Sequence, residues 1–109
     1  MAADAEFKDY VLDQLRELDE VVAKRMFSGW GLYHRGVFFG IVSRGRHYLK
    51  TDAAFRELFV DAGTGPFQPT AKMTLKTYYE VPAEVLEDAC VLGEWARRAV
   101  ACKLADGED

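Results

Sequence analysis

The sequence has little of what marks a membrane segment, a secretion signal or a disulfide framework. Its longest uncharged apolar stretch runs from Gly36 to Ser43, far below the ~20 residues that a membrane-spanning helix needs. The first residues lack a basic start followed by an apolar run, so no secretion signal is recognisable. The only cysteines are Cys90 and Cys102, which in one helix would stand roughly 18 Å apart, too far for a disulfide. We therefore expect a cytoplasmic protein with no membrane contact, whose two cysteines fill a helix face.

The sequence is also poor in residues that carry catalysis. His34 and His47 are the only histidines, and a nucleophilic mechanism would pair one of them with Ser28, Ser43 or Cys90. Nothing in the sequence places such a pair together, and neither histidine belongs to a ligand pair for a metal ion. We expect both histidines to face solvent. We identify no catalytic residue, metal site or cofactor, and we expect that the protein is not an enzyme.

Carboxylates are missing from one long segment of the chain. Between Glu20 and Asp52 the sequence has six Lys or Arg residues and no Asp or Glu. Residues 1–20 contain seven acids and two bases, residues 80–109 contain eight acids and three bases, and residues 21–79 contain nine bases and three acids. The formal net charge is −4. If the middle of the chain folds into a sheet and the ends into helices, a basic face lies beside acidic ones, which favours an oriented partner over an isolated enzyme pocket.

Apolar periodicity predicts helices at both ends of the chain and one in the middle. The first twenty residues are expected to form an amphipathic helix, since their apolar residues recur at helical spacing. A second helix is expected from Thr51 or Asp52 to Gly63. Pro82–Leu86 is expected to be a short helical turn, followed by a final helix that Asp88 can cap.

The segments between these helices have the period of two that is typical of strands. Trp30–His34, Val37–Ser43 and Arg46–Thr51 are separated by short Arg-Gly connectors, which predicts a three-stranded antiparallel meander with tight turns. Two further strands are expected, near Phe67 and from Lys72 to Val81. The order α-β(3)-α-β(2)-α predicts an α+β fold, with an antiparallel sheet covered by helices on one face. We assign residues 1–104 to one domain and expect residues 105–109 to form a frayed acidic tail.

Several groups of residues, taken together, form a combination typical of one known family. They are Arg25-Met26-Phe27-Ser28-Gly29-Trp30-Gly31-Leu32-Tyr33, Gly36, Phe39, Tyr48-Leu49-Lys50-Thr51-Asp52, Gly63 with Pro66-Phe67, the run Met73 to Pro82 with Tyr78-Tyr79-Glu80-Val81-Pro82, and Trp95. This combination closely resembles the N-terminal domain of the TfoX/Sxy family of competence regulators, over nearly the whole chain. The resemblance implies an α-β(3)-α-β(2)-α arrangement related to secretion-chaperone-like folds.

The resemblance also implies a class of function. The regulators after which the family is named promote competence genes together with a DNA-bound activator, and they carry a second, C-terminal domain that this sequence lacks. Solitary domains of this type have no catalytic residues to carry over. The resemblance therefore implies a stand-alone, non-enzymatic domain of the transcription-regulator type.

The open face of the predicted sheet is the candidate site, because Lys and Arg are interleaved there with Tyr. Strand alternation places Arg46, Tyr48 and Lys50 on one face, and Thr74, Lys76 and Tyr78 on one face. The candidate partner-binding residues are Arg35, Arg44, Arg46, Tyr48, Lys50, Lys72, Lys76 and Tyr78. We expect this face to dock a protein partner of a transcription-related kind, in a protein that forms a homodimer.

Three other interpretations of these residues remain open. The same face could bind nucleic acid weakly, with Tyr stacking on bases and cations meeting phosphate, although the net negative charge argues against autonomous DNA binding. The cations could also be ordinary solvated residues, or could pair with the acidic helices of the same or a second copy. A small-molecule role would need a polar pocket with convergent titratable groups, and the sequence assembles none.

Overall fold

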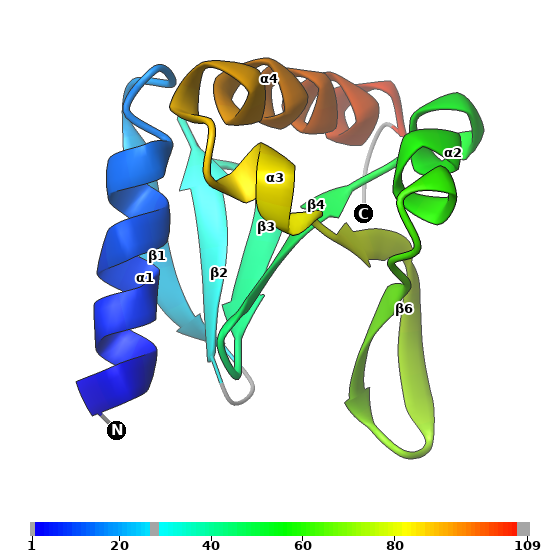
Figure 1. Cartoon of the computed structure of the whole chain (residues 1–109), viewed down its shortest axis with the longest axis horizontal. Coiled ribbons are helices and arrows are strands. Elements are labelled where there is room, and N and C mark those ends of the chain that lie inside the picture. The colour runs from blue at the N-terminus through cyan, green and yellow to red at the C-terminus, as the bar shows by residue number, and fades with distance from the viewer. Residues whose placement is uncertain (1, 27–28, 107–109) are drawn as a thin grey trace.

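The elements of this protein follow one another in the order that the sequence predicts, with one strand added (Figure 1). The computed structural model describes residues 2–26 and 29–106. The helices within these ranges are α1 (Ala2–Gln14), α2 (Ala53–Asp61), α3 (Ala83–Leu86) and α4 (Ala89–Ala105), and the strands are β1 (Val21–Met26), β2 (Gly29–His34), β3 (Val37–Ser43), β4 (Arg46–Lys50), β5 (Pro66–Thr70) and β6 (Met73–Glu80). The strands form one antiparallel sheet in the order β1-β2-β3-β4-β6-β5.

β1 is the strand that the sequence analysis did not predict. It pairs with β2 along its whole length, from Val21 opposite His34 to Met26 opposite Gly29. Its residues alternate in exposure only over the first four positions, because the adjacent cations Lys24 and Arg25 are both exposed. Two neighbouring charged residues hide the period of two in so short a segment. The described meander therefore has four strands instead of three, and the sheet has six instead of five.

Two tight turns connect the central strands, as predicted. Arg35 and Gly36 join β2 to β3 with φ of 51° and 85°, and Arg44 and Gly45 join β3 to β4 with φ of 53° and 75°. Positive φ at both positions is the signature of a type I′ turn, whose twist matches that of the flanking strands. Because successive hairpin turns lie at opposite ends of a sheet, the two arginines are presented at opposite ends.

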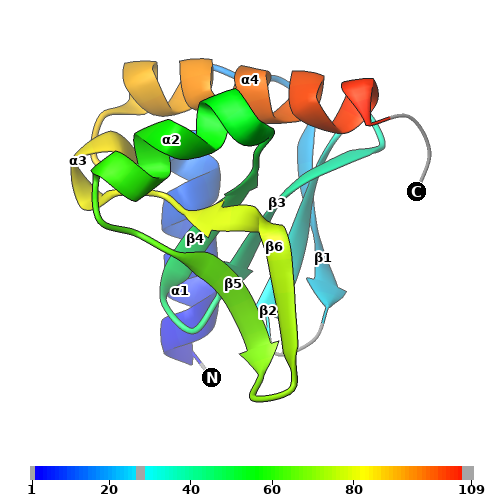
Figure 2. The same cartoon turned by 90° about the vertical axis from the view of Figure 1, so that its right-hand side faces the viewer.

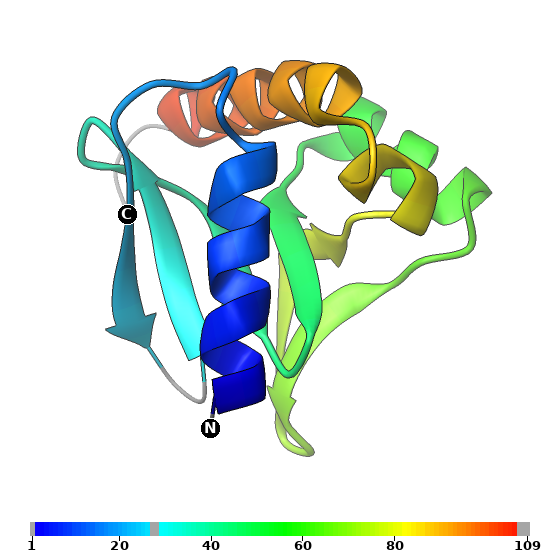
Figure 3. The ribbon, with the colours of Figure 1, turned by 60° about the vertical axis from the view of Figure 1, so that its left-hand side comes forward.

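The described helices bury their apolar side chains against one face of the sheet, which confirms the predicted α+β architecture. The main core combines residues of α1 and its following turn, α2, α3 and α4 with residues from the sheet; its buried members are Val11, Leu15, Leu18, Leu32, Phe39, Val42, Leu49, Phe55, Phe59, Val81, Val85, Leu92, Ala96, Ala99 and Cys102. Figure 3 shows α1 lying along this face and α4 crossing its end. The first helix ends at Gln14, so the expectation that it spans twenty residues is wrong. Val11 is buried on the helix and Leu15 and Leu18 are buried in the turn that follows it, while Tyr10 is exposed.

The opposite face is buried in part by the sheet itself. Its second cluster is made of Ile41, Tyr48, Phe67 and Tyr78, with Met26, Phe38 and Leu75 packed against them, and all of these residues lie on strands. The hairpin of β5 and β6 bends away from β4 (Figure 2), and its register shifts on both sides of Phe67. The ring centroids of Phe67 and Tyr48 are 4.7 Å apart, although β6 lies between their strands in the sheet order. The bend therefore brings the hairpin onto the helix-free face.

The C-terminal helix is longer than the sequence analysis predicts. α4 runs through Ala105, and Asp106 is its C-cap residue. The first two residues of the expected tail therefore belong to the helix end, while 107–109 lie outside the described residues. None of the described helices has the length and apolar character needed to cross a bilayer.

Replacement of Phe59 by Ala tests the main core. The Phe59 ring is fully buried and lies 4.9 Å from the ring of Phe55 and 4.8 Å from that of Trp95, between centroids. The F59A variant should lose about 3–5 kcal/mol of unfolding free energy in urea titrations, because it removes packing and leaves a cavity. The neighbouring change Leu58→Ala, on a side chain that is 41% exposed, should cost less than about 1 kcal/mol. Equal losses in the two variants would contradict this assignment of the core.

Candidate interaction surface

Tyr48 and Tyr78 are buried, not displayed on the open face. Only 8% of Tyr48 and 6% of Tyr78 is exposed. The Tyr48 ring packs on Phe67, and the Tyr78 ring centroid lies 5.3 Å from that of Phe38. Burial raises the pKa of the Tyr48 hydroxyl, and the nearby Glu80 carboxylate raises it further. Both tyrosines thus hold the bent sheet together, and their burial makes them unavailable for stacking on a base.

Lys50 is a buried cation that joins the end of α4 to the sheet. Its side chain is 6% exposed, and its ammonium forms an ion pair with Asp106. The Lys50 Nζ also donates a hydrogen bond to Thr77 Oγ1 at 3.1 Å and lies 5.6 Å from the Tyr78 ring centroid. The hydrogen bond and charge of Lys50 lower the pKa of Asp106. Lys50 therefore acts within the fold and does not present its charge to a partner.

Arg35 is partly neutralised by the acidic N-terminal segment. Its Nη2 lies 2.8 Å from Asp19 Oδ2, and its Nε lies 3.8 Å from Glu20 Oε1. All three side chains are more than half exposed, so these pairs contribute little to stability. They do reduce the positive charge that this end of the sheet presents.

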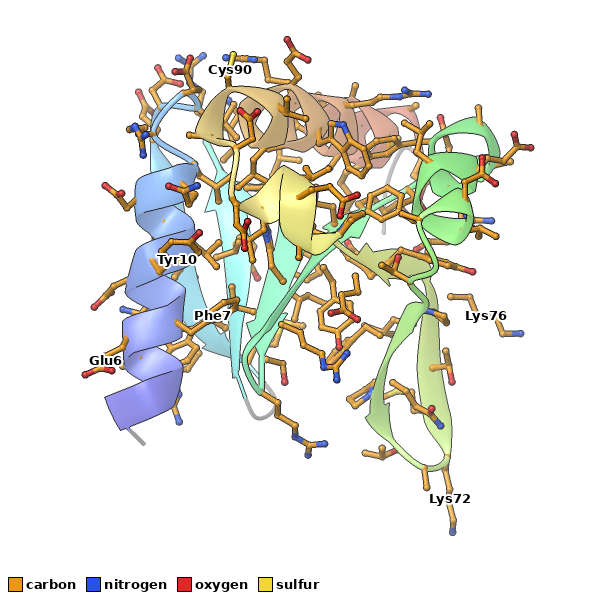
Figure 4. The ribbon with its side chains drawn as sticks, in the orientation of Figure 1. Glu6, Phe7, Tyr10, Lys72, Lys76 and Cys90 are labelled. Carbon is orange, nitrogen blue, oxygen red and sulfur yellow. The ribbon has the colours of Figure 1, made fainter. Side chains whose placement is uncertain are left out.

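Five of the predicted residues are exposed, and Arg35 is one of them. The other four have at most one carboxylate at ion-pair distance, and we call them the exposed cation set: Arg44, Arg46, Lys72 and Lys76. Arg46 donates to Glu80 Oε1 at 2.8 Å but is 58% exposed. Across 2–26 and 29–106, no ion pair involves Arg44, Lys72 or Lys76. Figure 4 shows Lys72 and Lys76 projecting away from the β5–β6 hairpin. This set is the part of the predicted surface that is exposed and least neutralised by carboxylates of the same chain.

The alternation expected along β6 is interrupted. Leu75, and not Lys76, packs into the second cluster together with Tyr78. The irregular register of the β5–β6 hairpin separates these two parts of the strand. Strand alternation alone places residues correctly only where a strand is regular, which holds for Arg46, Tyr48 and Lys50 but not across the bend of β6.

The expectation that His47 faces solvent is wrong. His47 is 1% exposed and stands opposite Val42, a residue of the main core. Neither ring nitrogen has a hydrogen-bond partner among the described residues. Burial without a partner lowers the pKa of the imidazole to about 3. A Cβ at Gly40 would lie only 2.9 Å from the backbone oxygen of Tyr48, whereas its distance of 3.5 Å to His47 Nε2 would be an ordinary contact.

Among the described residues considered for nucleophilic catalysis, Ser43 is not placed beside His47. His34 Nδ1 is 2.7 Å from the backbone oxygen of Asp19, at the β2–β3 end of the sheet. Ser43 stands opposite Arg46 in the register, so its side chain lies on the other face from that of the adjacent pair Val42 and His47. Ser28, the third candidate, lies outside the described residues.

The two cysteines differ in environment, whereas the sequence analysis treated them alike. Cys102 is buried in the main core, as predicted, and burial raises the pKa of its thiol. Cys90 is exposed at the start of α4 (Figure 4). Neither is part of a disulfide in the structure.

Lys24 and Arg25 are two exposed cations that the predicted surface does not include. The Lys24 ammonium lies 4.9 Å from the ring centroid of Tyr33, and the Arg25 guanidinium lies 5.0 Å from that of Trp30. Both distances are within the range of a cation–π interaction. The signal was present in the run Val21-Val22-Ala23-Lys24-Arg25-Met26, whose two β-branched residues precede the cations, but the strand itself was missed.

Fold and surface together define a small α+β domain with a helix-covered antiparallel sheet and exposed cations on its helix-free elements. The chain matches the family model of the TfoX N-terminal domain over residues 13–103, and it belongs to that family. This membership confirms the resemblance seen in the sequence and indicates a competence-related regulatory domain, in a family that is not known for enzymes. The comparison with curated proteins gave no match.

The buried His47 should make stability depend on pH. In the folded protein the imidazole stays neutral to about pH 3, whereas in the unfolded chain it takes up a proton near pH 6.5. Its contribution to stability is therefore complete above pH 6.5 and is lost as the pH falls from there toward 3, at up to about 1.4 kcal/mol per pH unit. Between pH 6 and 5, urea titrations should show that the original protein loses about 1 kcal/mol more than a His47→Met variant. Parallel pH profiles would contradict this.

Lys50 and Asp106 should respond unequally to substitution. Asp106→Ala leaves the Lys50 charge buried without its carboxylate, whereas Lys50→Met removes that charge and keeps a hydrocarbon chain in the same space. The D106A variant should therefore melt at a lower temperature than the K50M variant. The double variant should recover part of the loss of D106A, measured by thermal unfolding. A double variant less stable than D106A would refute the structural role of this pair.

Proposed function

We propose that this domain is a non-enzymatic protein-interaction module of transcription regulation, of the competence-regulator type, and that it docks a cytoplasmic protein partner through the exposed cation set. Membership of the TfoX N-terminal domain family supports the regulatory class. The observation that carries the docking mode is the exposure of Arg44, Lys72 and Lys76 without an ion pair in the described part of the chain. An acidic protein surface is the partner that complements them.

The distribution of cations favours this mode over the larger surface expected from the sequence. Arg35 and Lys50 already pair with carboxylates of the same chain, so they add little to the field at the exposed cation set. Arg46 is paired with Glu80 but keeps most of its guanidinium in solvent, where it can also meet a partner carboxylate. The charges that remain available stand on the turn before β4, on β4 itself and on the β5–β6 hairpin.

Nucleic acid is the less favoured partner. A single-strand platform needs aromatic rings that stack on bases, and the two tyrosines expected to supply them are buried. The net charge of −4 would also oppose approach to a polyanion. What the exposed cation set can still offer is phosphate contact, whose affinity would fall steeply with salt.

A second copy of the chain is one acidic partner that this mode allows. Of the two end helices α1 is the acidic one, with four carboxylates and one lysine in its sequence, and the exposed cation set could meet it across a dimer interface. Sedimentation of the purified protein at low and high salt measures this directly. If the protein is a dimer that dissociates with salt, the partner is a second copy of this chain. If it is a monomer under both conditions, the partner is another protein.

Charge reversal tests the docking mode. The double change Arg44→Glu and Lys72→Glu should lower recovery of the specific partner about tenfold in affinity capture quantified by mass spectrometry, because two attractive contacts become repulsive. A matched control, Arg16→Glu and Arg97→Glu, makes the same charge change at exposed arginines on the helix side. It should leave recovery unchanged.

The same variants distinguish the competing interpretations. A fluorescence anisotropy titration with a labelled DNA oligonucleotide at low ionic strength should show no binding by the original protein. If the original protein binds DNA in a salt-sensitive way and the R44E/K72E variant does not, the partner of the exposed cation set is nucleic acid and not a protein. Recovery of the same partners by the original protein and by R44E/K72E would overturn the docking mode.

A further inference from the structure

The sheet has two edges that differ in their capacity to accept another strand. β5 forms one edge and contains two prolines, Pro66 and Pro69, within its five residues. Proline has no N–H to donate, and its presence on an edge strand opposes further pairing. β1 forms the other edge, contains no proline and pairs only with β2 among the described strands. Every second residue of β1 therefore directs its backbone N–H and C=O away from β2.

The side chains of β1 place a cation on each face of this open edge. In the register with β2, Val22 and Lys24 stand opposite Tyr33 and Gly31, while Arg25 stands opposite Trp30. Alternation puts Lys24 and Arg25 on opposite faces, and each lies over a ring of β2 on its own face. Val22 is 51% exposed beside Lys24. The rings restrict where the two charges can lie, so the edge is preorganised for carboxylates on both faces.

The same cations oppose pairing of β1 with a second copy of itself. In an antiparallel self-pair with the strands fully overlapped, Lys24 of one copy and Arg25 of the other fall on the same face at diagonal positions. Shifting the register by one or two residues in one direction brings like charges directly opposite each other. Like charges at such positions destabilise a strand pair, and charged side chains are a common protection of edges against self-association. The partner strand that fits is one with carboxylates.

We infer that the β1 edge accepts an extended acidic peptide segment of a partner protein, by addition of a seventh strand to the sheet. Main-chain hydrogen bonds to the outward-facing groups of β1 would provide the affinity. Carboxylates on both faces of the added strand, next to Lys24 and Arg25, would provide the selectivity. The inference rests on the proposed function as an interaction module, but it uses a different surface from the exposed cation set.

A short synthetic peptide is the probe. An acetylated and amidated hexapeptide with threonine at each end, valine next to each threonine and two adjacent central glutamates would direct one carboxylate to each face of the sheet. In 15N NMR titrations, amide shifts should concentrate in Val21–Met26 and Gly29–His34, and hydrogen exchange should slow at alternate amides of β1. The same peptide with lysines in place of the glutamates should bind at least about tenfold more weakly.

Matched variants separate this site from the exposed cation set. Lys24→Glu with Arg25→Glu should weaken peptide binding at least about tenfold, and the milder Lys24→Gln with Arg25→Gln keeps the test valid if the reversal unfolds the strand. R44E/K72E should leave peptide binding unchanged. Absence of exchange protection in β1, equal binding of the lysine peptide, or shifts centred on Arg44 and Lys72 would each overturn the edge inference. None of these results would contradict the proposed docking mode, which uses the exposed cation set and is tested by the affinity capture with R44E/K72E.

Discussion

Helix cover on only one face of the sheet is the constraint on which the rest of this structure depends. The helices and the sheet face beneath them form the main core. The opposite face still carries large apolar residues, Ile41, Tyr48 and Phe67 among them, and water contact there would be costly. The protein meets this demand by bending β6 so that the β5–β6 hairpin folds back over the strands. Tyr48 and Tyr78 are buried in the resulting aromatic cluster, so they are not available to contact a partner.

The fold brings some of the cations of the middle segment next to carboxylates from the two ends of the chain, so part of the segregated charge is neutralised. Both acidic regions supply counter-charges to the basic middle: Asp19 and Glu20 lie beside Arg35, Glu80 pairs with Arg46, and Asp106 pairs with Lys50. Of these contacts, the buried pair of Lys50 and Asp106 joins the end of α4 to the sheet. Arg44, Lys72 and Lys76 stand on a turn and a hairpin and have no ion pair within the described part of the chain. Exposed positive charge in an acidic protein is thus a product of topology as much as of composition.

Much of the fold was readable from the sequence because its signals were local. The Arg-Gly turns, the Asp52 and Asp88 caps and the apolar stripe of α2 each depend on a few neighbouring residues. β1 was not predicted because its adjacent cations, Lys24 and Arg25, interrupt the alternation of apolar and polar residues that is typical of a strand. The bend of β6 was not predicted because alternation indicates which face of the sheet a side chain lies on, and does not indicate how the strand curves. The burial of His47 depends on its position opposite Val42 in a neighbouring strand, which the local sequence does not reveal.

The two candidate surfaces follow from different requirements of the sheet. The exposed cation set is what remains after the helix-free face has buried its aromatic residues and the chain ends have neutralised Arg35 and Lys50. The β1 edge exists because a sheet that is not closed must leave a strand unpaired at each side. Proline protects one side and like charge protects the other, and these protections are not equivalent. Proline deprives β5 of N–H donors that any incoming strand would need, whereas Lys24 and Arg25 repel only strands of their own sign. An edge guarded by charge is therefore selective, and selectivity for acidic segments is a property that an interaction module can use.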